Sequence, residues 1–103
     1  MSQQPATTAV PEPSAILEGL REALTVVLDK ADLAKVDLSA IDTRTPLLSL
    51  PLDSMALLEM VTRIENQFRV YIPAERAYEF VTVGEAVDFV RERAAAKATR
   101  RKA

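Results

Sequence analysis

An aspartate and a serine, Asp53 and Ser54, stand between the apolar stretches 50–52 and 55–58. A serine hydroxyl can act as a nucleophile or form a phosphodiester. Nucleophilic catalysis needs a base within hydrogen-bond reach, and the chain contains no histidine and no cysteine. A phosphate on Ser54 would be favoured at the start of a helix, because free N–H donors and the positive dipole end lie there. Ser54 is therefore predicted to be modified by another enzyme, with helix capping by the Asp-Ser pair as the simpler interpretation.

The element that would position this pair is a helix beginning at Asp53 or Ser54 and ending near Arg69. Its apolar residues recur at intervals of three and four, which is typical of one buried helix face. These residues are predicted to be core: Leu57, Val61, Ile64 and Phe68. The sequence Tyr71-Ile72-Pro73 then interrupts the helix, because a residue before proline favours extended geometry.

Three further helices are predicted around this one. The first runs from Ser14 to about Lys30, and a short one covers 75–79. The last begins with a capping box, in which Thr82 is the N-cap and Glu85 stands three residues later. Its predicted inner face is Val83, Ala86, Val87 and Val90. Beyond residue 93 the periodicity fades, and the helix is expected to fray.

A long connection, residues 31–52, joins the first helix to the Asp-Ser helix. A structureless loop of this length is unusual, but its aliphatic residues predict that it packs over the helices, with a short helical turn inside. These residues are Val36, Leu38, Ile41, Leu47, Leu48, Leu50 and Leu52. The expected fold is all-α, a small bundle of three main helices and one short helix. Residues 1–13 are predicted to be a disordered leader, 14–93 the folded domain and 94–103 a basic tail.

Composition excludes several classes of protein. Without cysteine there is no disulfide framework or thiolate metal site, and no metal centre is predicted. No apolar run approaches the length of a membrane span, so the chain is expected to be cytoplasmic, with no membrane partner. Residues 1–90 hold 14 acidic and 7 basic side chains, whereas 91–103 hold one acidic and six basic. The basic tail is interpreted as a solvated helix end and not as a nucleic-acid site, because no aromatic residues interleave with its cations. A monomer is expected.

Residues 50–90 resemble the acyl carrier proteins. The matching elements are D-S-M at 53–55, the amphipathic run 57–68, Y-I-P at 71–73, A-Y-E-F at 77–80 and T-V-G-E-A-V-D-F-V at 82–90. The resemblance implies that Ser54 receives 4′-phosphopantetheine from coenzyme A through a magnesium-dependent phosphopantetheinyl transferase, and that Asp53 helps this transferase and its magnesium to engage. It also implies no enzymatic activity. Partners would be the transferase, an acyl- or aminoacyl-loading enzyme and a downstream synthase or transferase.

The residues expected to contact these partners are Met55, Ala56, Glu59, Met60 and Arg63. Carriers of general fatty-acid synthesis usually have acidic residues at three positions where this chain has Ala56, Asn66 and Ala74, so electrostatic steering toward basic enzymes would be weak. The sequence therefore favours a specialised polyketide, peptide or modified-lipid pathway. A general fatty-acid carrier and an unmodified helical adaptor for other proteins remain as alternatives.

Overall fold

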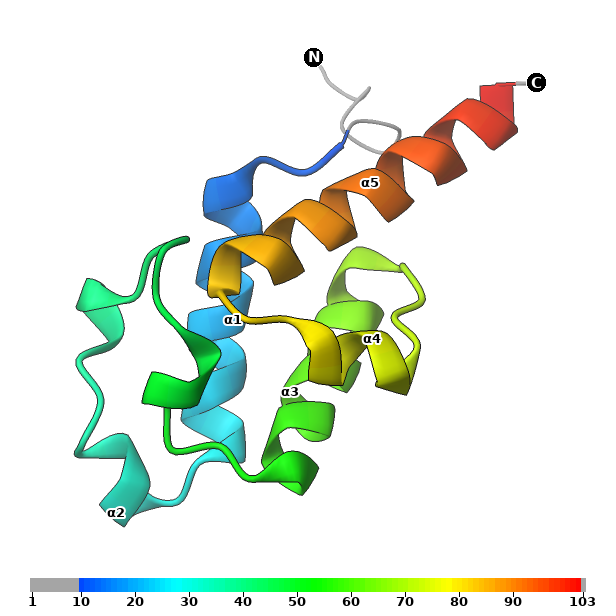
Figure 1. Cartoon of the computed structure of the whole chain (residues 1–103). Helices are drawn as coiled ribbons and strands as arrows, with labels where there is room; N and C mark the ends of the chain where they lie inside the picture. The colour runs from blue at the N-terminus through cyan, green and yellow to red at the C-terminus, as the bar shows by residue number, and fades with distance from the viewer. Residues whose placement is uncertain (1–9, 103) are drawn as a thin grey trace.

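The computed structural model describes residues 10–102, and within this part of the chain the regular elements are helical (Figure 1). In chain order they are α1 (Pro13–Val27), α2 (Lys30–Leu33), the 3₁₀ turns η2 (Leu38–Ala40) and η3 (Leu47–Ser49), α3 (Ser54–Phe68), α4 (Ala74–Glu79) and α5 (Val83–Lys102). The predicted all-α bundle is confirmed: α1, α3 and α5 are the three long helices, and α4 is the short helix.

Helix α1 begins with Pro13 at its first position, where proline costs nothing because that N–H would be unpaired. It ends at Val27, slightly before the predicted end near Lys30. The chain turns at this point because Asp29 begins a new helix: its Oδ1 accepts a hydrogen bond of 2.8 Å from the Asp32 N–H. The separate helix α2 follows, and it forms the helical turn expected inside the long connection.

The long connection packs on the bundle, as predicted, and one arginine attaches its middle to α1. The guanidinium of Arg21 donates from Nε to the Leu38 carbonyl at 2.9 Å and from Nη2 to the Ile41 carbonyl at 2.8 Å. Ile41 is buried beneath this attachment. Leu48 is an exception, since its side chain is 98% exposed and the prediction that it packs is wrong. The 3₁₀ turn η3 places Leu47 inside and its neighbour outside.

The end of the same connection pairs with the start of α5. The Leu47 N–H donates to the Val81 carbonyl and the Val83 N–H to the Thr45 carbonyl, both at 2.9 Å. The Gly84 N–H donates to the Thr43 carbonyl at 2.8 Å. A Cβ at position 84 would lie 2.7 Å from that oxygen, so the close approach requires glycine here.

Helix α5 starts at the predicted capping box. The Glu85 N–H donates to Thr82 Oγ1 at 3.2 Å, and the Glu85 carboxylate accepts from the Val81 N–H at 2.8 Å. The helix does not fray at residue 93 but continues to Lys102, and its C-terminal end projects beyond the other helices (Figure 1). Lys97 contributes to this extension, because its Nζ donates to the Arg69 carbonyl at the end of α3 at 2.8 Å.

The core lies where α1, α3 and α5 meet. Its largest fully buried side chains are Ile16, Leu20, Leu24, Met60, Val83, Val87 and Val90. The predicted stripe of α3 divides: Val61 and Ile64 are buried, whereas Leu57 and Phe68 pack against the core at its edge. None of the described helices is long and apolar enough to span a membrane. Residues 1–9 of the predicted leader lie outside the described residues, and the Pro11 carbonyl accepts a 3.0 Å hydrogen bond from Arg91 Nε.

Candidate functional site

The Asp-Ser pair lies at the N-terminal end of α3, and the structure assigns the capping role to one of the two residues. Asp53 is the N-cap, with extended backbone, and its Oδ1 accepts a hydrogen bond of 2.7 Å from the Ala56 N–H. Ser54 is the first residue inside the helix. The interpretation of Ser54 as a cap is therefore excluded, and its hydroxyl is not needed to start the helix.

Ser54 is accessible from solvent. Its side chain is exposed, and among the described residues no hydrogen-bond partner is found for its hydroxyl. The N–H groups of the first turn lie beside it, and only some of them are satisfied by Asp53. A negatively charged group attached to this oxygen would meet the positive end of the helix dipole.

The predicted partner contacts occupy different sides of α3. Met55 is 79% exposed, Glu59 and Arg63 are exposed, and Ala56 is half-buried. Met60 is 1% exposed and lies in the core, so its prediction as a partner contact is wrong. The physical reason is helical phase: Met60 lies one turn before the buried Ile64 and next to Val61, and these three side chains share the inner face.

The exposed charges of α3 nearly balance. Glu59 and Arg63 are one turn apart and cancel. Glu65 is half-buried and is used by the fold, because its Oε2 accepts a 2.6 Å hydrogen bond from the Ile72 N–H and so fixes the turn before α4. Apart from the Asp53 carboxylate beside Ser54, the exposed charges along α3 therefore nearly cancel, and Met55 is its most exposed apolar side chain.

Two features of the connection that leads to α3 were not predicted from the sequence. Leu48, in the turn that precedes the site, adds a second exposed apolar side chain to this part of the chain. Arg21 orders the connection that leads to the site, through the two carbonyl contacts described above. Neither has a signal in the local sequence, because both depend on segments that are distant along the chain.

Comparison with known proteins identifies the family. The phosphopantetheine attachment site family matches residues 18–90, which include most of α1, all of α2, α3 and α4, and the first part of α5. The chain belongs to the acyl carrier protein family. Members of this family are carriers and not enzymes, and their cofactor is 4′-phosphopantetheine.

Two solved structures share this carrier fold, both from Streptomyces coelicolor. The 3,7-dioxo-octyl actinorhodin acyl carrier protein has a TM-score of 0.66 and 28% sequence identity, over 79% of this chain and 92% of that one. Hexanoyl acyl carrier protein from the actinorhodin polyketide synthase has a TM-score of 0.62 and 30% identity, over 75% of this chain and 87% of that one. The predicted fold and family are thus confirmed.

Proposed function

We propose that Ser54 is the residue to which 4′-phosphopantetheine is attached, and that the chain carries acyl or aminoacyl groups on this arm. The observation that carries the proposal is an exposed serine hydroxyl in the first turn of α3, beside a capping aspartate and inside the segment that matches the attachment-site family. When bound, the group supplies a thiol that holds the cargo as a thioester. The chain itself supplies no such thiol, since it has no cysteine.

The residues around Ser54 fit this role. The new phosphodiester would lie near the free N–H groups of the first turn, where negative charge is favoured. Asp53 holds the Ala56 N–H through Oδ1. Its Oδ2 has no hydrogen-bond partner in the described part of the chain. This oxygen is therefore free to bind the magnesium ion of the transferase. One carboxylate thus serves both the helix and the modifying enzyme.

The exposed side of α3 would be the surface that binds the transferase, the loading enzyme and the downstream enzyme. Met55, Ala56, Glu59 and Arg63 are the contacts we propose for them. A methionine suits a surface that meets several partners in turn, because its flexible thioether adapts to different shapes. The carrier is expected to act as a monomer, with its enzymes as transient partners.

The cargo belongs to a specialised pathway in this proposal. Charge on α3 is nearly balanced, so long-range attraction toward basic enzyme surfaces is weak there. Among polyketide, peptide and modified-lipid pathways, the likeness to two carriers whose names place them in actinorhodin biosynthesis supports the polyketide class. A general fatty-acid carrier is the second candidate, and transfer of acetyl and malonyl groups by fatty-acid enzymes would favour it.

The test is the intact mass of the purified protein before and after incubation with coenzyme A, magnesium and a broad-specificity phosphopantetheinyl transferase. The expected result is a gain of one phosphopantetheine in the wild type and none in Ser54→Ala. If the mass of folded wild-type protein does not increase, the proposal is overturned, and the alternative of an unmodified helical adaptor that binds other proteins is favoured. Loading of Ser54→Ala would place the attachment at another residue.

A further inference from the structure

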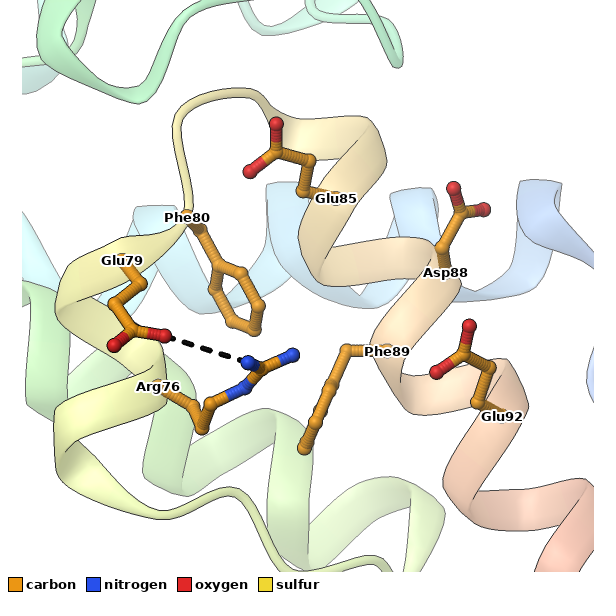
Figure 2. Close-up of a pocket in the computed structure, with 7 residues that line it drawn as sticks. All are labelled: Arg76, Glu79, Phe80, Glu85, Asp88, Phe89 and Glu92. Carbon is orange, nitrogen blue, oxygen red and sulfur yellow. Dashed lines mark hydrogen bonds and ion pairs between the residues drawn. The ribbon is translucent and has the colours of Figure 1, made fainter.

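A hollow of about 300 Å³ lies between α4 and α5 (Figure 2). Two half-buried aromatic rings form its apolar side: the ring centroids of Phe80 and Phe89 are 5.7 Å apart, and the rings are tilted by 57°. Phe80 comes from the segment after α4, and Phe89 from the middle of α5. A ring face in such a hollow offers both apolar contact and a negative electrostatic potential.

A guanidinium group already lies in this hollow. The Cζ of Arg76 is 5.0 Å from the centroid of the Phe89 ring, and its Nη1 is 3.4 Å from Glu79 Oε1 (Figure 2). The distance to the ring is within the range of cation–π contacts. Both partners of the ion pair are half exposed or more, so the contact is weak and can be exchanged. The hollow therefore has a shape and charge that accommodate a cationic side chain.

More negative charge surrounds the hollow than Arg76 neutralises. Glu85, Asp88 and Glu92 line it from α5, in addition to Glu79 from α4 (Figure 2). Glu85 accepts the Val81 N–H, whereas Asp88 and Glu92 are exposed and have no cation within ion-pair distance among the described residues. A second guanidinium, that of Arg93, has its Cζ 6.0 Å from the centroid of the Phe89 ring. Four carboxylates thus stand against two guanidinium groups, which leaves an excess of negative charge, in contrast with the nearly balanced charges of α3.

We infer that this hollow is a docking site for a basic segment of a partner protein, which inserts an arginine or lysine side chain against Phe80 and Phe89. The incoming cation lies near Asp88 and Glu92, and an apolar neighbour covers the exposed ring edges. The excess of carboxylates favours a partner with basic side chains. The incoming cation would lie over an aromatic ring in the same way as the Arg76 guanidinium lies over Phe89. Docking here leaves Ser54 out of the contact, so the inference does not depend on attachment at Ser54.

The probe is an acetylated and amidated peptide, Leu-Arg-Gly-Leu-Arg, added to the unmodified, isotopically labelled full chain and followed by NMR amide shifts. A second peptide carries citrulline in place of both arginines, which keeps the shape and removes the charge. Two charge reversals complete the design. Asp88→Lys changes the hollow, and Glu22→Lys makes the same change of net charge at an exposed position of α1.

The expected result is a set of saturable shifts centred on residues 76–92 with the arginine peptide and not with the citrulline peptide. Asp88→Lys is expected to weaken binding by about fivefold or more, and Glu22→Lys by less than about twofold. Shifts centred elsewhere, equal effects of the two reversals, or the same shifts with magnesium chloride at equal ionic strength would overturn the inference. Shifts that grow with protein concentration without any peptide would instead make a second copy the occupant.

Discussion

Two methionines of α3, Met55 and Met60, have opposite environments. Met55 is 79% exposed in the first turn, and Met60 is 1% exposed on the inner face. Five residues of an α-helix correspond to a rotation of about 140° beyond a full turn, so the two side chains point to different sides. The same residue type is thus exposed to solvent at one position and buried in the core at the other. The first turn of α3 can be changed with little effect on folding, whereas the inner face cannot.

The largest effect expected in the first turn is a loss of loading without a loss of stability. Ser54→Ala is expected to abolish phosphopantetheine transfer and to change the free energy of unfolding by less than about 0.5 kcal/mol, because Asp53 and not Ser54 caps the helix. Mass spectrometry and urea denaturation measure the two quantities. Ser14→Ala, at an exposed serine in the first turn of α1, is the matched control and is expected to load normally.

The largest stability effect belongs to the inner face. Met60→Ala is expected to lower the free energy of unfolding by about 2–5 kcal/mol, because it removes a fully buried side chain and leaves a cavity. Met55→Ala is expected to stay within about 0.5 kcal/mol and to slow transfer by the transferase. Chemical denaturation of both variants measures their free energies of unfolding. Equal destabilisation by the two substitutions would contradict the difference in burial between Met55 and Met60.

Asp53 allows its two roles to be separated. Asp53→Ala is expected to cost about 1 kcal/mol, because the Ala56 N–H loses its acceptor. Asp53→Asn keeps a side-chain oxygen and is expected to retain most of that stability, since asparagine is an equally good N-cap. If the carboxylate engages the magnesium of the transferase, the asparagine variant is nevertheless loaded more slowly. Normal loading of a stable Asp53→Asn protein would restrict Asp53 to capping.

The smallest effect is expected at Leu48. Leu48→Ser should change the free energy of unfolding by less than about 0.5 kcal/mol, because the side chain is almost fully exposed. Its neighbour Leu47 is buried, and Leu47→Ser should destabilise the fold by several kcal/mol, about as much as other large reductions of buried apolar side chains. Thermal unfolding of the two variants tests whether η3 buries Leu47 and exposes Leu48.

Local sequence patterns were sufficient to predict the main helices. The capping box at Thr82 and Glu85 placed the start of α5, and the spacing of apolar residues placed α1 and α3 within a few residues of their observed bounds. Such signals are local: a cap acts within one turn, and a helix face repeats every three or four residues. The Asp-Ser pair and the motifs that follow it also indicated the family correctly.

What the sequence by itself determined about this protein is therefore its main helices and its family, and it made Ser54 the candidate for modification. The tertiary structure decided which methionine is buried, that Leu48 is exposed, and that Arg21 holds the long connection. It also decided why position 84 must be glycine and how α4 and α5 enclose an acidic aromatic hollow. The physical reason is distance along the chain: these features arise where segments far apart in sequence meet, and only their packing determines which atoms are left in contact with solvent.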